Sequence, residues 1–540
     1  MIDTRKVYLV GTTLPACRSE YLPALTQGDT FITMTTPCVA ELAQMPTPTQ
    51  SLARGSVTML LSMSAAGALS IAISIMIARW LGVADFGMYA VVISVQGVVS
   101  LLASFSVGAA IAKYVSEYRS RDEEQALRFA KSGFVLVLIL AALVCIVYAS
   151  LGALIGKGLY KESAMVGIMP FSAAMVFGSS VFSTSMGVVQ GCQRFRLMAG
   201  MQVSSPLLSL AMISALLPLM GIRGIFVGYS VSLLVVSSLV LAILNRSGFR
   251  FVSAQLELGR NSLAVSKMYS FALPAVLGGL MVVPVVWIAN TELTLSVGLQ
   301  AMGYFAVANV FYQALILIPS AISITMMPRV SQLTVGNHDD IERLVVKVLR
   351  TLSIALFPLL FAIALFSEFV VEIMYGSRFS ASAKAVYLMV TASYFYSLSA
   401  VVGTMIAGMG RMWLGLCLNI FWAAVFLTLV FAGVPALGTN GLALSYAAGY
   451  GIFLAFTIIV SKRVLHVSVK GTYLAGTSAA FFFLTGFFTE GMSTISELAA
   501  KLGLLLMGTA YFCLIGREVV RTIYLRVMGI LHRSWFSRAV

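Results

Sequence analysis

The sequence is dominated by about fourteen apolar segments, each roughly twenty residues long, between residues 56 and 516. A bilayer's hydrocarbon core is about 30 Å thick and an α-helix rises about 1.5 Å per residue, so each segment can cross once. Backbone polar groups in lipid must bond within the protein, which favours helices for spans this long. We therefore predict an all-α polytopic membrane protein. The predicted spans are 56–78, 86–112, 133–156, 164–188, 197–219, 224–244, 270–291, 299–328, 351–374, 383–407, 412–434, 438–461, 471–489 and 498–516.

The composition agrees with a membrane protein. The chain is 59% hydrophobic and 10% charged, and its mean hydropathy of +0.96 lies far above the soluble range. Because the spans use up most of the 540 residues, we expect one membrane unit rather than several soluble domains.

The basic residues indicate an orientation. With the N-terminus in the cytoplasm, the cytoplasmic segments hold 28 Lys and Arg and the opposite side holds 7, which together make the 35 in the chain. Such a bias over short loops predicts that both termini are cytoplasmic. The net charge of +15 is therefore a signal of topology and of attraction to anionic headgroups, not of nucleic-acid binding.

The segments outside the spans carry few other signals. Residues 1–53 are rich in Thr and Pro and are predicted to be a disordered cytoplasmic extension. Residues 517–540 alternate Arg with apolar residues, which suits either an amphipathic helix on the membrane surface or a solvated basic tail. The six cysteines form no CxxC pair, so we expect neither a disulfide framework nor a metal site.

The chain contains an internal duplication with an offset of 216 or 217 residues. Three pairs of short motifs match in corresponding spans: GMYAV at 87–91 with GYFAV at 303–307, GCQR at 191–194 with GMGR at 408–411, and GIRG at 221–224 with GTNG at 438–441.

This duplication predicts the architecture. An even number of spans per repeat gives both repeats the same orientation, so a pseudo-two-fold axis along the membrane normal relates them. We predict two six-helix lobes, 56–244 and 270–461, which are joined by the loop 245–269. Two extra helices in 471–516 follow the repeat. Two lobes around one axis indicate an alternating-access transporter rather than a channel or receptor.

Acidic residues are candidates for coupling or gating, because charge inside a membrane is costly. The four acidic residues closest to the spans lie near span ends rather than at span centres. Asp85 precedes a helix and is expected to be its N-cap, while Glu292 follows span 7. Glu368 and Glu372 share one helical face at the end of span 9, where an exposed position is the simplest interpretation.

Five basic residues near the cytoplasmic ends of spans are candidates for binding a substrate headgroup. Arginine binds phosphate through two parallel hydrogen bonds, so a group of basic side chains could gather a diphosphate. The alternative for each is membrane anchoring by snorkelling. The candidates are Arg54, Lys113, Arg194, Arg329 and Arg411, of which Lys113 and Arg329 are related by the repeat.

Span 7 has the composition of a bent helix. It contains Pro274, Gly278, Gly279 and Pro284, and proline removes a backbone hydrogen bond while glycine lowers stiffness. This helix is therefore a candidate gate, or else has a static kink that packing accommodates.

Enzymatic motifs are missing from the sequence. It has no HExxH, Walker A loop or nucleophile elbow, and no hydrophilic stretch large enough for a catalytic or ATPase domain. We predict a non-enzyme without a resident cofactor, driven by an ion gradient, the membrane potential, a partner or the substrate's own gradient.

Four segments resemble the motifs of Wzx-type flippases, which belong to the multidrug/oligosaccharidyl-lipid/polysaccharide (MOP) superfamily. Together they extend over most of the predicted membrane unit. They are 78–90 (ARWLGVADFGMYA), 108–118 (GAAIAKYVSEY), 301–308 (AMGYFAVA) and 373–380 (IMYGSRFS).

The resemblance implies a bacterial inner-membrane protein that moves a polyprenyl-diphosphate-linked oligosaccharide to the periplasmic leaflet for O-antigen, exopolysaccharide or capsule synthesis. It further implies a V-shaped two-lobe fold, proton or sodium coupling, and other polysaccharide assembly proteins as partners. Many relatives carry Asp near the end of span 7, where this chain has Asn290 and a displaced Glu292. Asn290 therefore joins Asp85, Glu292 and Pro284 as a candidate for coupling or gating.

Other functions remain open at this stage. A cation-coupled small-molecule antiporter of the MATE type would need carboxylates deep in its lobes. A polymerase or ligase would need a large periplasmic loop. A lipid II flippase shares the fold and differs only in its substrate.

Overall fold

The computed structural model describes residues 48–119, 121–246, 281–334 and 338–465, together with residues 467 and 503. The chain divides into two units, Met1–Arg54 and Gly55–Val540, and the first is described only where its last residues form a helix. Residues 1–47 of the predicted extension lie outside the described residues, as do almost all of the inter-lobe loop and of spans 13 and 14, and the basic tail. Residues 48–53, which were predicted to be disordered, begin α2 instead.

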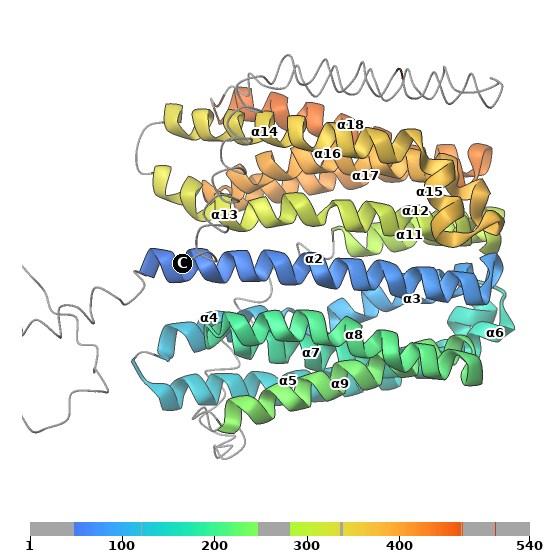
Figure 1. The fold of residues 1–540 in the computed structure, drawn as a ribbon, viewed down its shortest axis with the longest axis horizontal. Coiled ribbons are helices and arrows are strands. Elements are labelled where there is room, and N and C mark those ends of the chain that lie inside the picture. The colour runs from blue at the N-terminus through green and yellow to red at the C-terminus, as the bar shows by residue number, and fades with distance from the viewer. Residues whose placement is uncertain are drawn as a thin grey trace, which may run out of the picture. The chain divides into compact units, whose positions relative to one another are not determined.

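Helices make up all the regular structure of the described residues (Figure 1). The first half of the chain contains α2 (Pro48–Leu81), α3 (Val83–Ser104), α4 (Val107–Tyr118), α5 (Glu123–Ser150), the π-helix η1 (Leu154–Leu159), α6 (Ser163–Val166), α7 (Met169–Gly191), α8 (Phe195–Met220) and α9 (Ile222–Arg246). The second half contains α11 (Val283–Val297), α12 (Leu299–Leu315), α13 (Leu317–Leu333), α14 (His338–Leu365), α15 (Ser367–Tyr375), the 3₁₀-helix η2 (Ser377–Ser382), α16 (Ala383–Gly408), α17 (Met412–Leu437) and α18 (Thr439–Val464).

Eleven helical segments of the described chain are long and apolar enough to cross a bilayer. They confirm the predicted all-α polytopic membrane protein. Helix α11 is shorter, with 15 residues, and corresponds to the end of predicted span 7. The total of fourteen spans stays a prediction, because spans 13 and 14 are not among the described residues.

The predicted position of span 9 is wrong. The spanning helix α14 runs from His338 to Leu365, whereas the prediction placed it at 351–374. Its first part is amphipathic: Ile341, Val345 and Leu349 are buried, while Arg343 and Lys347 are exposed. The prediction excluded these turns because of their charge, although one face of the helix packs inside the protein.

Spans 2 and 8 each consist of two helices instead of one. The backbone between α3 and α4 adopts left-handed conformations at Phe105 and Ser106, with φ of 43° and 53°, which α-helices do not accommodate. In the second half, α12 gives way to α13 at Ile316. The same region of each repeat is therefore interrupted.

The backbone confirms the internal duplication. Residues at the repeat offset share unusual positive φ values where helices end or begin. The pairs are Gly82 and Gly298 (80° and 109°), Gln193 and Gly410 (54° and 74°), and Gly221 and Gly438 (58° and 58°).

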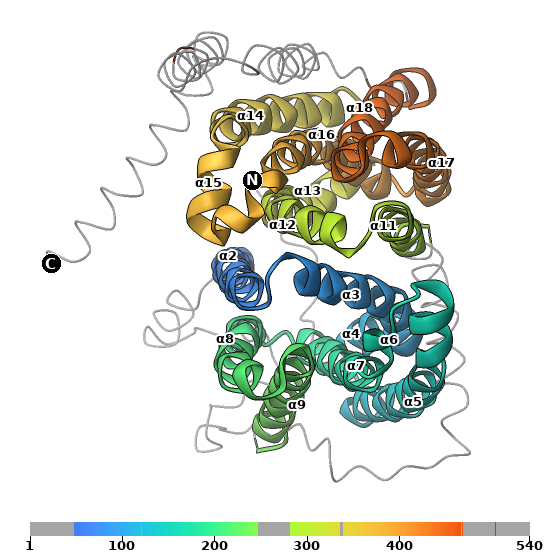
Figure 2. The same ribbon diagram turned by 90° about the vertical axis from the view of Figure 1, so that its right-hand side faces the viewer.

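The two halves approach each other most closely where α3 meets α12. Figure 2, an end-on view, shows α2–α9 on one side and α11–α18 on the other, with α3 facing α11 and α12. A Cβ atom at Gly87 would lie 1.9 Å from the carbonyl oxygen of Leu299, and one at Gly303 would lie 2.1 Å from that of Val83. These contacts are reciprocal, because 303 − 87 and 299 − 83 both equal 216. The pseudo-two-fold axis therefore passes between α3 and α12.

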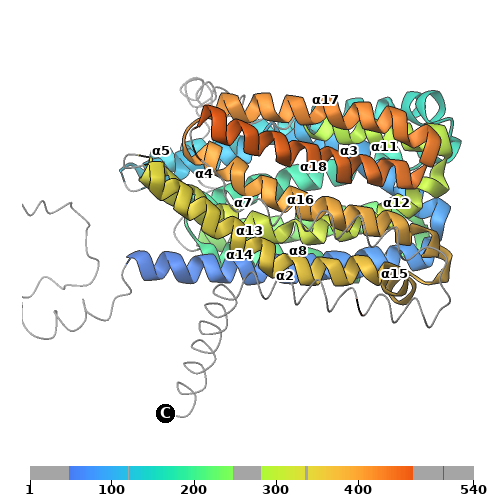
Figure 3. The same ribbon diagram turned by 90° about the horizontal axis from the view of Figure 1, so that it is seen from above.

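Each half also has packing of its own. Figure 3 shows α16, α17 and α18 of the second half side by side. The larger buried core contains residues of both halves, such as Val91 and Phe305. A second core contains Val107, Phe129 and Val188 and belongs to the first half alone, with contributions from α4, α5, α7, α8 and α9.

We predict that Gly87→Ala destabilises the protein, because a methyl group at Gly87 cannot fit against the α12 backbone without moving the helices apart. Overpacking of this kind costs about 1–3 kcal/mol. The measurement is the thermal unfolding midpoint of the purified protein. Gly97→Ala on the same helix is the matched control, since its Cβ would meet Val283 at an ordinary 3.6 Å. Equal midpoints for the two variants would contradict the close approach.

Candidate functional site

The candidate site is the contact between the two halves at the end of the bundle that carries α15, here called the α15 end. There α3 packs on α11 and α12, and α12 also contacts η2. The helices that continue α3 and α12 pack within their own halves: α4 on α5 and α7, and α13 on α14 and α16. The halves are thus held together at the α15 end, while at the opposite end, here called the α4 end, these two helices follow separate partners (Figure 1).

Tyr160 joins the first half to α11. It directly follows the π-helix η1, and its phenol oxygen lies 2.7 Å from Thr291 Oγ1. The indole nitrogen of Trp287 donates to the same phenol at 3.1 Å. Burial raises the pKa of Tyr160 above its ordinary value, and the two hydrogen bonds offset only part of that rise. The phenol is therefore neutral at physiological pH.

Tyr375 makes the corresponding contact from the second half to α2. It is the last residue of α15, it is buried, and its phenol oxygen lies 3.3 Å from Ser74 Oγ. Burial raises the pKa of Tyr375 to about 12, although the Ser74 hydrogen bond acts in the opposite direction. Because the raised pKa favours the neutral phenol, this contact persists below the ordinary pKa and weakens only as the pH rises toward 12. Phe86 and Phe379 pack edge to face beside it, with centroids 6.0 Å apart.

Arg79 strengthens the contact at α15. Its Nε donates to the carbonyl oxygen of Met374 at 2.8 Å, and its Nη2 donates to that of Ile373. Both carbonyls belong to the last turn of α15, where backbone acceptors have no partner within the helix and the helix dipole favours a cation. A side chain from the end of α2 thus caps a helix of the other half.

Asn290, next to Thr291 on α11, also connects the halves. Its side chain is buried, and Nδ2 donates to Ser94 Oγ on α3 at 3.0 Å. Its Oδ1 has no hydrogen-bond donor within the described protein. An orphaned buried acceptor costs about 1–3 kcal/mol. Of the predicted coupling and gating candidates, Asn290 is the one that makes a direct polar contact between the halves.

The other coupling and gating candidates have local roles in the structure. Glu292 is half-buried and accepts a hydrogen bond from Ser296 one turn later, at 2.7 Å. The predicted N-cap at Asp85 is wrong: α3 starts at Val83 with Gly82 as its N-cap, so Asp85 lies exposed in the first turn. A carboxylate in that turn still complements the helix dipole.

Pro284 begins α11 and does not kink it. It is the second residue of the helix, where the missing N–H has no helical partner to lose. The rest of the predicted bend in span 7, at Pro274, Gly278 and Gly279, lies outside the described residues. Glu368 and Glu372 are both exposed on α15, in agreement with the simplest interpretation of them.

The basic candidates fall into two repeat-related pairs. Lys113 on α4 and Arg194 at the start of α8 belong to the first half, while Arg329 on α13 and Arg411 at the start of α17 belong to the second. Their offsets are 329 − 113 = 216 and 411 − 194 = 217. Lys113, Arg329 and Arg411 are exposed, and Arg194 is half-buried. The side chain of Arg54 lies outside the described residues.

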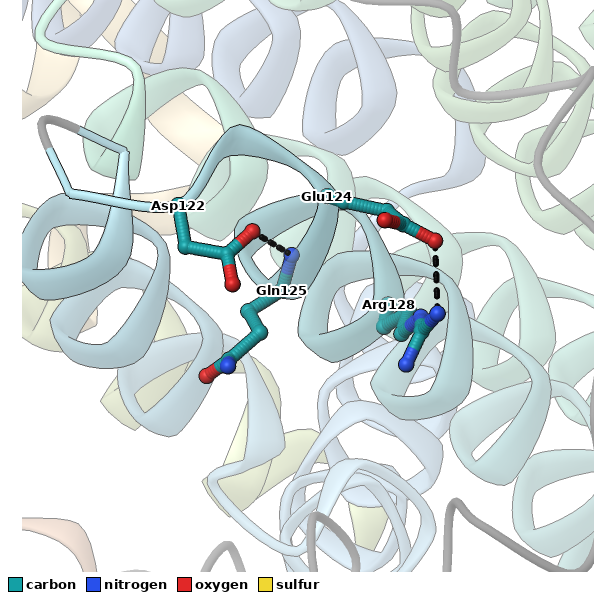
Figure 4. A network of polar contacts seen from close by, with 4 residues as sticks. All are labelled: Asp122, Glu124, Gln125 and Arg128. Carbon is teal, nitrogen blue, oxygen red and sulfur yellow. Dashed lines mark hydrogen bonds and ion pairs between the residues drawn. The ribbon is translucent and has the colours of Figure 1, made fainter.

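The basic end of the first half has local support that was not predicted. Arg119, after α4, donates to the carbonyl oxygen of Cys192 at the end of α7. Nearby, Asp122 caps α5 by accepting from the Gln125 backbone N–H at 3.0 Å, and Glu124 pairs with Arg128 at 2.6 Å (Figure 4). These contacts fix the start of α5 next to the Lys113 helix, α4.

The sequence analysis missed Tyr160, Tyr375 and Arg79 as functional residues. In the structure each tyrosine directly precedes a residue with positive φ, Lys161 or Gly376, which the sequence does not reveal for Lys161. No group of three or more His, Cys, Asp or Glu residues that could hold a metal ion occurs among the residues that the structure describes.

Comparison with known proteins gives matches by family and by fold. A family model described as "polysaccharide biosynthesis protein" matches residues 76–384. No curated protein matches the chain by sequence.

Several solved structures share the fold. The chain is similar to the lipid II flippase MurJ in its inward closed conformation, with a TM-score of 0.67 and 12% identity over 86% of this chain and 99% of that one. It is also similar to an inward-facing MATE multidrug resistance transporter of the MOP superfamily, with a TM-score of 0.63 and 14% identity over 79% and 99%. A mutant of the Vibrio cholerae MATE transporter VcmN is similar with a TM-score of 0.57 and 16% identity, over 77% of this chain and 97% of that one.

We predict that Ser94→Ala lowers the thermal unfolding midpoint more than Asn290→Leu does. Ser94→Ala leaves both polar groups of the buried Asn290 amide unsatisfied, at a cost of about 1–3 kcal/mol. Asn290→Leu removes the hydrogen bond and the orphaned Oδ1 together, so the two effects largely cancel. A larger loss for Asn290→Leu would mean that Oδ1 has a partner in the membrane.

Proposed function

Since the chain belongs to the polysaccharide biosynthesis protein family, we propose that it is a flippase which moves a polyprenyl-diphosphate-linked oligosaccharide across the bacterial inner membrane. The observation that carries this proposal is the family match over residues 76–384, which include the contact between the halves. The fold shared with MOP-superfamily transporters supports it. Such a protein needs no covalent chemistry and no resident cofactor.

The physical task suits a protein built from two halves. A diphosphate and its glycan cannot cross hydrocarbon, because burying an unpaired charge costs many kcal/mol. The proposed cycle shields this headgroup between the halves while the polyprenyl tail stays in lipid. Closure at the α15 end, through Tyr160, Tyr375 and Arg79, supports a state in which the headgroup enters from the α4 end.

The basic residues favour an anionic headgroup at that entrance. Lys113 and Arg194 on one half and Arg329 and Arg411 on the other lie at repeat-related positions, so they offer the diphosphate similar groups from both sides. Charge-assisted hydrogen bonds to phosphate are about twice as strong as neutral ones. The positive-inside bias supports a cytoplasmic location for the α4 end.

Ion coupling is part of the proposal. A proton or sodium gradient would bias the cycle toward export, and Glu292 is the carboxylate nearest to the contact residue Asn290 in sequence. Its hydrogen bond from Ser296 would have to break for the carboxylate to take part.

A lipid II flippase is the second candidate, because the fold is similar to that of MurJ. Both substrates would present a lipid diphosphate and differ in the attached glycan. The family match to polysaccharide biosynthesis favours the first candidate. A MATE-type antiporter is the third, supported only by fold.

The first test is a deletion strain, in which lipid-linked oligosaccharides and the surface polysaccharide are measured together. We expect polyprenyl-linked repeat units to accumulate on the cytoplasmic leaflet while the surface polymer is lost. Accumulation of lipid II would favour the second candidate. Unchanged pools and an unchanged surface polymer would reject both flippase assignments and leave the antiporter.

We predict that the double variant Lys113→Gln, Arg329→Gln lowers the level of surface polysaccharide in a complemented deletion strain. Each charge-assisted contact contributes about 1.5–3 kcal/mol, so loss of the pair should weaken headgroup binding by tenfold or more. The control is Arg343→Gln on α14, an exposed residue that is paired with Asp340 at 3.1 Å. An equal fall in the control would show that net charge, not headgroup binding, is responsible.

A further inference from the structure

We propose that Tyr160 and Tyr375 are two repeat-related latches that, together with Arg79, hold the α15 end closed and release together when that end opens. The inference rests on the proposed transport cycle, to which it adds the residues that close one end. It is carried by the reciprocity of two hydrogen bonds that come from distant parts of the chain.

Each latch tyrosine lies at the end of a helix and directly before a residue with positive φ. Tyr160 follows the π-helix η1 and precedes Lys161, with φ of 57°, while Tyr375 ends α15 and precedes Gly376, with φ of 93°. A positive φ turns the chain sharply after each tyrosine. The tyrosines therefore share a backbone context, and their separation of 215 residues is one less than the smaller repeat offset.

The hydroxyl partners of the latches occupy neighbouring positions of the repeat, since residue 74 corresponds to residue 290 at the offset of 216. Each tyrosine reaches across to a hydroxyl on a helix of the opposite half that ends just before the paired glycines Gly82 and Gly298. Ser74 precedes Gly82, and Thr291 precedes Gly298, by about two helical turns. The two contacts measure 3.3 Å for Tyr375 and 2.7 Å for Tyr160.

Reciprocal contacts about a two-fold axis respond together. In such an isologous arrangement, residue i of one half meets residue j of the other, and the reverse. A rotation of the halves that lengthens one tyrosine contact therefore lengthens its counterpart. Because both contacts join neutral groups, each has a modest net strength and can break without exposing a buried charge.

Arg79 is the part of this closure that the repeat does not duplicate. The residue at the offset of 216 is Leu295, which is exposed and apolar. Hydrogen bonds from Arg79 to Ile373 and Met374 hold the carbonyl end of α15 immediately before Tyr375. Arg79 thus positions the Tyr375 latch, while Tyr160 receives its second bond from Trp287.

The test measures how often the α15 end opens in the purified full-length protein. In a background in which the six native cysteines are replaced by serine, Phe379→Cys provides the reporter, because Phe379 is buried beside Tyr375 and packs on Phe86 of the other half. The rate of maleimide labelling at this position reports opening without requiring a substrate or a known orientation in the membrane.

We expect Tyr160→Phe and Tyr375→Phe each to raise the labelling rate about fivefold, because each variant loses one neutral hydrogen bond. The double variant loses both bonds, so its labelling rate should rise about 25-fold. Tyr148→Phe is the matched control. Its hydroxyl is also buried and bonded, to Ser172 at 2.9 Å, but within the first half alone. The control should leave the labelling rate unchanged.

Two results would overturn the latch: an unchanged labelling rate in the double variant, or an equal increase with Tyr148→Phe. Circular dichroism of each variant checks that the fold is intact. The surface polysaccharide measurement separates this proposal from the proposed function. Faster labelling supports the latch even if the deletion strain shows no change in lipid-linked oligosaccharides, a result that would count against the flippase alone.

Discussion

The structure depends on one backbone contact, the approach of α3 to α12 at Gly87 and Gly303. Neither position has room for a side chain, because carbonyl oxygens of the opposite helix occupy the places where Cβ atoms would lie. Lipid tails are as apolar as leucine, so helices in a membrane associate through close packing and small residues, not through hydrophobic burial. This contact brings the latch tyrosines within reach of their partners across the axis.

The duplication produces the reciprocal contact between the halves, but repeat-related buried positions carry different residues in the two halves. Gln96 and Ser209 of the first half are buried with an orphaned side-chain oxygen each. At the repeat offsets the second half has Tyr312 and Phe426, which belong to a cluster of packed rings. Aromatic rings fill space and fix one packing arrangement, whereas unsatisfied polar atoms favour water or an alternative arrangement. At these two positions the second half therefore has packed rings where the first half has unsatisfied polar atoms.

Much of this arrangement could be predicted from the sequence. Apolar length and basic residues at span ends indicated the helical membrane fold, and the motifs at Gly87 and Gly303 indicated the repeat and the family. Span 9 was misplaced because its amphipathic start carries charge on one face only. Which glycine meets which carbonyl depends on tertiary packing, so the central contact could not be derived from spacing. Tyr160 and Tyr375 lie between spans, where periodicity carries no information.

The neutral character of the closing contacts follows from what a transporter must do. A closure built on buried ion pairs would leave uncompensated charge each time it opened, and breaking such a pair costs several kcal/mol. Phenol–hydroxyl bonds can be exchanged for bonds to water when the end opens, so the two states stay close in free energy. The one charged group, Arg79, is exposed and binds backbone carbonyls, so its release leaves no carboxylate behind. The chemistry of the α15 end therefore suits reversible opening, while the glycine contact beneath it preserves the axis about which the halves move.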